Sequence, residues 1–326
     1  MTDINELMDA GYKITGRVTD SANPTVGVPD VFVAAQPNGG CCFYGTKTMA
    51  DGRYIMVLSA ATYRISFFSP VGSDFLEQWW NDKLGYATAD LVTVPSTTVD
   101  LSAINAALVH GIPVAGSVTD SSTGAAVAGV GVVADRDDPP TSCCLSYQAR
   151  TGADGRYTMY VSAGTYRLNF QPPNTTDYVI EYWNQKPNRD SADLLTVTGP
   201  TSGIDARLDR GFRISGRVTD AATSDPLSFS VVTINPLGCC QAFTIVGTAS
   251  DGTYSVLVRA GSYKIGFNPP YGTDFVPQYW DGRPDLASAD TLVVNGPRPN
   301  IDAALAHPSA SSGPPSDGTP PAGSGP

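Results

Sequence analysis

One passage of this sequence occurs three times at intervals of about 100 residues, and this repetition constrains the fold more than any other feature. Residues 16–20, GRVTD, return as GSVTD at 116–120 and as GRVTD at 216–220. A period of this length exceeds that of solenoid repeats, which run roughly 20–50 residues. It matches the size of an independent domain, about 100–150 residues. The sequence therefore predicts three tandem copies of one domain.

Other landmarks keep the same order within each copy. A pair of adjacent cysteines comes first, then an Asp-Gly step with a tyrosine two residues later, and finally an aromatic residue followed by tryptophan. The spacing predicts repeats at residues 12–110, 111–210 and 211–307. Residues 1–11 precede them and residues 308–326 follow.

Hydrophobic patterning predicts an all-β fold for each copy. Tyr63, Ile65 and Phe67 alternate with other residues, as one face of a strand requires. Strands are expected over residues 12–19, 28–35, up to 49, 54–58, 62–68, 91–94 and up to 108. The Asp51-Gly52 step predicts a tight primed hairpin turn, because both central residues of that turn adopt positive φ. About seven short strands per repeat indicate a β-sandwich.

The order of these motifs resembles that of the carboxypeptidase regulatory-like family. The resemblance rests on GxVTD, then DGRY, then AGTYR at residues 163–167, then a closing segment of the form I-D-A-x-L, as at residues 204–208. It covers residues 12–307 and implies three tandem seven-stranded prealbumin-like (Ig-like) β-sandwiches of the bacterial secreted or surface type. The best-known members of this family sit beside a zinc carboxypeptidase domain, and relatives share the broad carbohydrate-binding-like fold. This chain has no such domain, so the resemblance implies an accessory or structural role.

The two ends differ from the repeats. Ile4 and Met8 stand before Gly16 as Ile104 and Leu108 stand before Gly116, so residues 1–11 are expected to be the final strand of a missing preceding repeat or a disordered arm. Residues 308–326 consist mainly of Ser, Gly and Pro, a composition typical of a linker. We therefore expect the chain to be a segment of a longer multidomain protein.

Charge and hydropathy exclude several classes of partner. The net charge is −11, and the sequence has no basic cluster. Nucleic acid is therefore not an expected partner. No apolar run approaches the roughly 18 residues of a membrane span, so no membrane insertion is expected in this segment.

The histidines do not indicate catalysis. His110 and His307 each stand two residues after the closing leucine of a repeat, and Arg210 takes the same place in the second repeat. A position that accepts arginine is neither a zinc ligand nor a general base. The recurring Asp20, Asp74 and Asp90 are interpreted as turn-capping residues. The sequence therefore predicts a protein that is not an enzyme and needs no metal or other cofactor.

The adjacent cysteine pairs allow three interpretations. Neighbouring Cα atoms lie near 3.8 Å apart, closer than ordinary disulfides allow, so a bond within a pair would form a strained ring. The alternatives are buried thiols, and metal binding or intermolecular bonding. The vicinal disulfide is favoured, and it implies an oxidising compartment. The cysteines concerned are Cys41, Cys42, Cys143, Cys144, Cys239 and Cys240.

All four tryptophans fall in a recurring aromatic motif that is the candidate ligand site. Aromatic faces flanked by amide or carboxylate groups suit stacking on a sugar ring. The structural alternative is that the second aromatic residue closes one end of the core while the first covers a loop. The motif comprises Trp79, Trp80 and Asn81, then Tyr182, Trp183 and Asn184, then Tyr279, Trp280 and Asp281.

The sequence as a whole predicts a non-catalytic array, extracellular or on the cell surface, that acts in adhesion, spacing or assembly. Two other hypotheses stay open: a carbohydrate-binding module that uses the aromatic motif and the cysteine loops, and an accessory segment of a larger secreted hydrolase. The expected partners are a polysaccharide, another surface protein or further copies of the chain.

Overall fold

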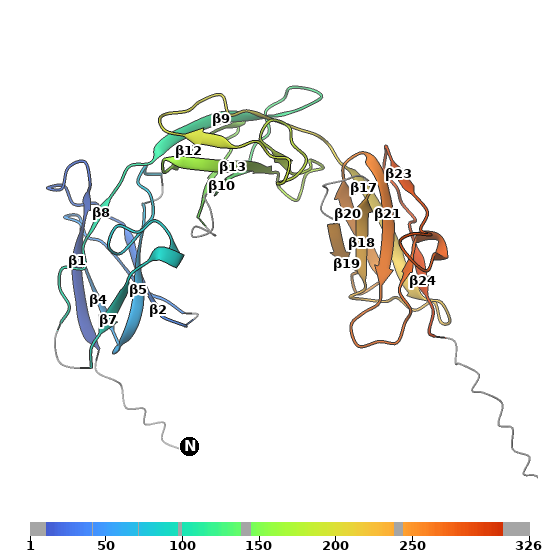
Figure 1. Ribbon diagram of the computed structural model, residues 1–326, viewed down its shortest axis with the longest axis horizontal. Helices are drawn as coiled ribbons and strands as arrows, with labels where there is room; N and C mark the ends of the chain where they lie inside the picture. Colours follow the sequence, from blue (N-terminus) through green and yellow to red (C-terminus); the bar gives the residue numbers. More distant parts are fainter. Residues whose placement is uncertain are drawn as a thin grey trace, which may run out of the picture. The chain divides into compact units, whose positions relative to one another are not determined.

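The computed structural model describes residues 11–40, 42–70, 72–96, 100–137, 145–237 and 244–308. Within these residues the chain is almost entirely β-structure, with only two short 3-10 turns, Tyr86–Thr88 and Trp280–Gly282. It divides into two compact units, 1–210 and 211–326. Figure 1 shows the strands of the first repeat in blue to cyan, those of the second in green to yellow and those of the third in orange.

Within the described residues, each repeat contains eight strands in the same order. In the first repeat they are β1 (Tyr12–Asp20), β2 (Phe32–Pro37), β3 (Tyr44–Lys47), β4 (Arg53–Leu58), β5 (Ala61–Phe68), β6 (Gln78–Trp79), β7 (Leu91–Val94) and β8 (Ala106–Leu108). In the second they are β9 (Ile112–Asp120), β10 (Gly131–Arg136), β11 (Ser146–Arg150), β12 (Arg156–Val161), β13 (Gly164–Gln171), β14 (Glu181–Tyr182), β15 (Leu195–Val197) and β16 (Ala206–Leu208). In the third they are β17 (Phe212–Asp220), β18 (Val231–Pro236), β19 (Thr244–Gly247), β20 (Thr253–Val258), β21 (Gly261–Asn268), β22 (Gln278–Tyr279), β23 (Leu292–Val294) and β24 (Ala303–Leu305).

The strands of each repeat form a smaller and a larger sheet. In the first repeat the smaller sheet has the order β4-β1-β8, and in the larger one β3-β2-β5 continues to β6, with β7 also paired to β5. The first and last strands, β1 and β8, run parallel, whereas the other strand pairs are antiparallel. The second and third repeats have the same arrangement.

Each repeat has its own cluster of buried hydrophobic residues between its two sheets. The expected alternation on β5 is confirmed: Tyr63, Ile65 and Phe67 are buried, and the Phe67 ring contacts the Tyr54 ring edge-on at 6.2 Å between centroids. The three clusters and the repeated topology confirm the all-β sandwich fold.

The prediction for the Asp-Gly turn was wrong in its geometry. Gly52 has a φ of 79°, but Asp51 is not among the residues with positive φ, so the turn is not of a primed type. The amide of Gly52 instead donates to the Met49 carbonyl (2.9 Å), and the Asp51 carboxylate accepts from the Arg53 amide (3.0 Å). The turn also joins β3 of one sheet to β4 of the other. It therefore works as a corner between the layers rather than as the end of a hairpin.

Two further details differ from the sequence prediction. The second strand was expected to begin at residue 28, whereas β2 begins at Phe32. Residues 28–31 connect the sheets, and the Val28 amide donates to the Val18 carbonyl (2.9 Å). The strand count of about seven omitted β6, a two-residue strand inside the aromatic motif. Strands this short have no period that a sequence pattern can reveal.

Candidate functional site

The recurring GxVTD segment and the closing segment of each repeat form one junction. Gly16 lies on β1, and the carbonyl oxygen of Ile104 occupies the place where a side-chain Cβ would stand. The same carbonyl accepts a hydrogen bond from the Tyr54 hydroxyl (2.6 Å), and burial raises the pKa of that tyrosine. Only glycine allows this close approach of two chain segments.

Asn105, which follows Ile104, links the closing segment to β1 by a hydrogen bond. The Asn105 side-chain oxygen accepts from the Arg17 amide (2.8 Å), and residues 106–108 then pair in parallel with residues 18–20. Both features recur in the other copies, where Asp205 and Asp302 accept from the amides of Ser117 and Arg217 at 2.8 Å. The motif I-[N/D]-A-x-L is therefore the device that closes each sandwich.

A histidine side chain completes the junction of the first repeat. His110 lies 2.9 Å from Asp74 and 3.1 Å from Asp20, and its ring stacks on Phe75 at 4.4 Å between centroids. The bond to Asp74, followed by the one to Asp20, raises the pKa of His110. The Asp20 pKa is lowered, first by the amide of Ala22 and then by His110.

In the second repeat, arginine takes the place of histidine. Arg210 donates to the Asp120 carboxylate through Nε (3.0 Å) and Nη2 (2.8 Å), and the Tyr178 hydroxyl donates to the same oxygen (2.8 Å). Asp120 is only 1% exposed. The Ser122 hydroxyl and then Tyr178 hold the pKa of Asp120 well below its usual range.

The third repeat returns to histidine. His307 lies 2.8 Å from Asp274 and 3.9 Å from Asp220, with its ring stacked on Phe275. The residue that stands two positions after the closing leucine thus contacts the aspartate at the end of the first strand in every repeat. The residues are His110, Arg210 and His307. The turn-capping interpretation is confirmed for Asp20 but is incomplete, because Asp74 bonds His110 and Asp90 accepts from the Asn81 side chain.

The described residues contain no cluster of potential metal ligands. Within them, no group of three or more His, Cys, Asp or Glu side chains is placed so that it could hold a metal ion. None of the helices in the described part of the chain is both long and apolar enough to span a membrane.

In the aromatic motif, the second ring of each copy packs against the core. Trp80, Trp183 and Trp280 are partly buried and contact the first, second and third hydrophobic clusters. The Trp80 amide donates to the Ile65 carbonyl (2.8 Å), and the Trp183 amide to Leu168 (3.0 Å). These contacts agree with the structural alternative for the second ring.

The polar residue of the motif is held by a contact that sequence reasoning missed. Asn81 has a φ of 64°, and its amide nitrogen donates to Asp90 (2.6 Å). Asn184 has a φ of 60° and donates to Asp193 (2.8 Å). In the third copy, Asp281 also has a φ of 60°, and Arg283 bonds Asp290 instead (3.0 Å). Asparagine and aspartate tolerate this left-handed backbone better than most residues.

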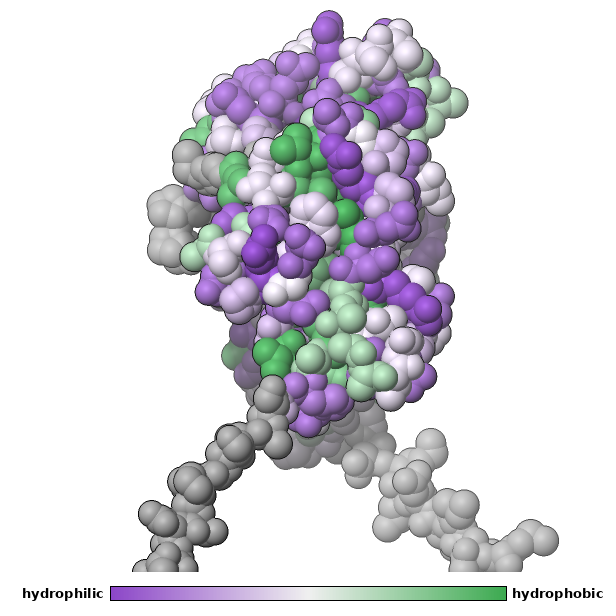
Figure 2. Space-filling view, turned by 90° about the vertical axis from the view of Figure 1, so that its right-hand side faces the viewer, coloured by the Kyte–Doolittle hydropathy of each residue, from purple (hydrophilic) through white to green (hydrophobic). Residues whose placement is uncertain are grey.

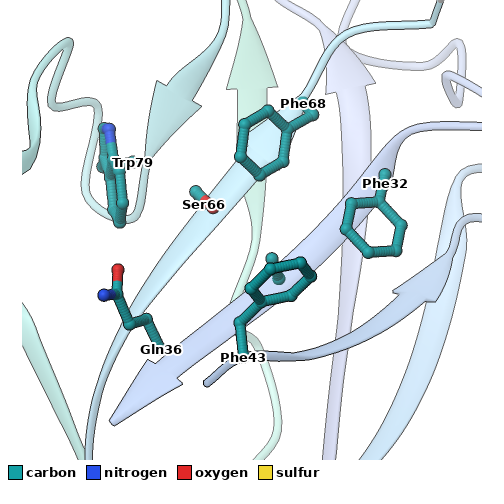
Figure 3. Close-up of a pocket in the computed structure, with 7 residues that line it drawn as sticks. Phe32, Gln36, Phe43, Ser66, Phe68 and Trp79 are labelled. Atoms are coloured by element: carbon teal, nitrogen blue, oxygen red, sulfur yellow. The ribbon is translucent and has the colours of Figure 1, made fainter. Parts of the chain in front are cut away.

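The first ring of the motif has different surroundings in each copy. Trp79 lines a pocket of about 290 Å³ together with Phe32, Phe43 and Phe68, as Figure 3 shows. Tyr182 is partly buried, and this burial raises its pKa. Tyr279 lies against Gly266, where an added Cβ would meet its ring at 3.1 Å.

Most of the cysteine prediction falls outside the described residues. Cys41, Cys143, Cys144, Cys239 and Cys240 lie there, and Cys42 is described and exposed. The vicinal disulfide therefore stays a prediction.

On the face shown in Figure 2, polar residues separate the apolar ones into small groups. Large exposed hydrophobic side chains in the third repeat include Val231, Ile245 and Val293. Isolated exposed apolar residues of this kind are normal on a soluble protein surface.

Comparison with known proteins gives structural neighbours only. No family model and no curated protein sequence match the chain, so the resemblance to the carboxypeptidase regulatory-like family stays a prediction. A Streptococcal ancillary pilin is 11% identical, over 91% of this chain and 99% of that one, with a TM-score of 0.30. The major pilin SpaD of Corynebacterium diphtheriae is 7% identical, over 94% and 100%, with a TM-score of 0.25. The Bacillus anthracis TIE protein is 11% identical with a TM-score of 0.25, and the match covers 91% of this chain but only 50% of TIE. Identities and TM-scores this low establish neither a family nor a function.

Proposed function

We propose that this chain is a non-catalytic spacer and assembly segment of an extracellular or cell-surface protein, and that its repeats hold two ends of the chain apart under tension. The observation that carries the proposal is the parallel pairing of the first and last strands in each repeat, β1 with β8, β9 with β16 and β17 with β24.

Parallel terminal strands determine where the chain enters and leaves a domain. Because β1 and β8 run in the same direction, the chain enters the first repeat at one end of the sandwich and leaves it at the other. Within each repeat of this topology, the chain is therefore carried from one end of the sandwich to the other. Antiparallel terminal strands would instead return the chain to its starting end.

The same geometry determines how a pulling force acts. Tension applied between the ends of a repeat is directed along β1 and β8, so their hydrogen bonds are loaded together in shear rather than one after another. The side chains of the junction add to this resistance: Tyr54 bonds Ile104, Asn105 bonds Arg17, and His110 bonds Asp20. The Asn105 and His110 links join β1 to the closing part of the repeat, and the Tyr54 link joins that part to β4, the antiparallel partner of β1.

Single-molecule force spectroscopy on the full chain tests this proposal. Three unfolding events of similar force are expected, each releasing about 300 Å of contour length, because roughly 100 residues extend at 3.3–3.6 Å each from a folded length of some 35 Å. Unfolding without separate peaks, or with one repeat extending at negligible force, would contradict the spacer function.

The carbohydrate-binding hypothesis receives less support from the contacts. Asn81 and Asn184, the amides expected to bind a sugar, donate to Asp90 and Asp193 of their own repeats. A polysaccharide-binding screen remains the direct test, and binding that depends on Trp79, Tyr182 and Tyr279 together would favour this hypothesis. The role as an accessory segment of a hydrolase is decided by the sequence of the parent protein.

A further inference from the structure

The outer face of the larger sheet in the first repeat carries a slot lined by aromatic rings. Phe32, Ala34 and Gln36 of β2 alternate with the core residues Val33 and Ala35, so their side chains point away from the core. On β5, Ser66 and Phe68 point to the same outer face. This face includes the pocket of about 290 Å³ that also contains Phe43 and Trp79.

Strand register explains the shape of the slot. Ala34 lies opposite Ser66, which in turn lies opposite Trp79, so small residues form a floor that leads to the indole ring. Phe32 lies opposite Phe68, with ring centroids 6.0 Å apart, and forms one wall. Figure 3 shows Trp79 on one side of this floor, with the phenylalanine rings on the other and Gln36 at the lower end.

The other two repeats lack this arrangement at the matching positions. In the second repeat, Val133 and Asn169 replace the floor residues, and Gly131 and Gln171 replace the wall. Asn169 and Gln171 bond each other there (2.8 Å). In the third repeat, Val231 and Asn268 replace the wall. The slot is thus a property of the first repeat and is not required by the common fold.

Exposed aromatic residues in such a cluster indicate a binding surface. Phe43 is 64% exposed, and Phe68 is 37% exposed. A slot of this composition is typical of a recognition site. The residues that line it carry no charge, and only Gln36, Ser66 and the Trp79 indole nitrogen supply side-chain polar atoms. This lining favours an uncharged, largely apolar occupant over a sugar, which needs several hydrogen-bonding partners.

We propose that the occupant is the proline-rich segment of a second copy of this chain, residues 308–326, of which the structure describes only Pro308. Proline-rich segments form the extended polyproline II helix, whose stiffness lowers the entropy lost on binding, and aromatic-lined grooves are their common receptors. The proposal does not depend on the spacer function.

The spacing of prolines in the segment suits such a site. Pro314-Pro315 and Pro320-Pro321 are offset by six residues. In a polyproline II helix, which has three residues per turn, residues six apart face the same side. The segment has no basic residue and only one acidic residue, Asp317, so it brings little charge to an uncharged slot. One proline pair can fill the slot while the Gln36 amide donates to a peptide carbonyl.

Fluorescence anisotropy of a labelled peptide with the sequence of residues 308–326 tests the proposal. The peptide is titrated with the full chain and with the chain ending at His307. Saturable binding is expected, and it should be tighter for the shortened chain, because the chain's own segment then no longer competes. Light scattering of the full chain should show association between copies that is lost when the chain ends at His307, because the segment of one copy then no longer occupies the slot of another.

Matched variants locate the binding. Phe43→Ala or Trp79→Ala should weaken binding about tenfold or more, the usual effect of removing an aromatic anchor. The double change Ala34→Val with Ser66→Asn introduces the floor of the second repeat and should abolish binding while leaving the aromatic walls in place. Tyr279→Ala, the matched change in the third repeat, should have no effect. Thermal melting of each variant verifies that it is folded.

Several results would overturn the proposal. These are an absence of saturable binding to the shortened chain, or equal binding by a peptide in which Pro314, Pro315, Pro320 and Pro321 are all alanine. Loss of peptide binding in the Tyr279→Ala variant, but not in the slot variants, would also overturn the proposal. Self-association of the shortened chain that is lost with Phe43→Ala would show instead that the slot binds a second copy through its folded repeats.

Discussion

Replacement of Gly116 by alanine should break the junction of the second repeat. A Cβ at this position would overlap the Ile204 carbonyl oxygen, so β9 and the closing segment must move apart. That movement weakens the bonds from the Tyr157 hydroxyl to Ile204, from the Ser117 amide to Asp205 and from the Ile204 amide to Ala115. At about 1 kcal/mol for each hydrogen bond, the free energy of unfolding should fall by roughly 3 kcal/mol.

This loss is large for a domain of this size. Single domains are stable by about 5–15 kcal/mol, and 1 kcal/mol corresponds to roughly 4–8 °C in Tm for 60–100 residues. Urea denaturation of the full chain, with hydrogen exchange read separately for each repeat, should place the loss in residues 111–210. Gly131→Ala is the matched control, because an added Cβ there meets its neighbours only at ordinary contact distances. Equal stability of the two variants would refute the close-approach argument.

Four further predictions concern the repeats and their ends. Residues 111–210 expressed alone should unfold cooperatively, since about 100 residues can bury enough surface for a core; a product without a thermal transition would contradict the domain boundaries. Mass spectrometry of the unreduced protein should show six thiols lost and no covalent dimer, and bonds mapped between different repeats would exclude vicinal disulfides. Removal of residues 1–10 should leave light scattering unchanged, whereas loss of an oligomer on truncation would indicate strand exchange. The contacts with Asp74 and Asp20 raise the pKa of His110 in the folded repeat above its ordinary value of about 6.5. The first repeat should therefore be most stable below about pH 6.5 and should lose stability as the pH rises through the raised pKa. In a thermal-melt series, His110→Arg should remove this dependence, and an unchanged pH profile would argue against the His110 contacts.

The strands were predictable from local pattern, whereas the junction was not. Alternation on β5 and the turn residues at Asp51-Gly52 act over a few positions, so the sequence indicates them directly. The bond between Asp20 and His110 joins residues 90 apart and exists because β1 and β8 run parallel. The turn type was wrong because an Asp-Gly step serves both a primed turn and a turn in which only glycine has positive φ.

The candidate ligand site shows the same limit of sequence reasoning. The aromatic motif was visible as a pattern, but the pattern could not separate Trp79, which lines the slot, from Trp80, which packs against the core. Two other slot residues lie outside the motif: Phe43 directly precedes β3, and Phe68 is the last residue of β5. Comparison of the outward positions of the three copies is the sequence signal that could have found them.

The three copies separate the requirements of the fold from those of a site. Positions that are the same in all copies, such as Gly16 and Tyr54, contact the closing segment of their own repeat, so the fold alone accounts for them. The junction residue varies between histidine and arginine, and both His110 and Arg210 bond the aspartate that ends the first strand of their repeat. The outward face needs neither aromatic walls nor a small floor for folding, since the second repeat forms the same sheet without them. Selection for folding therefore does not explain the rings at Phe32, Phe43 and Phe68, and a binding role for the first repeat does.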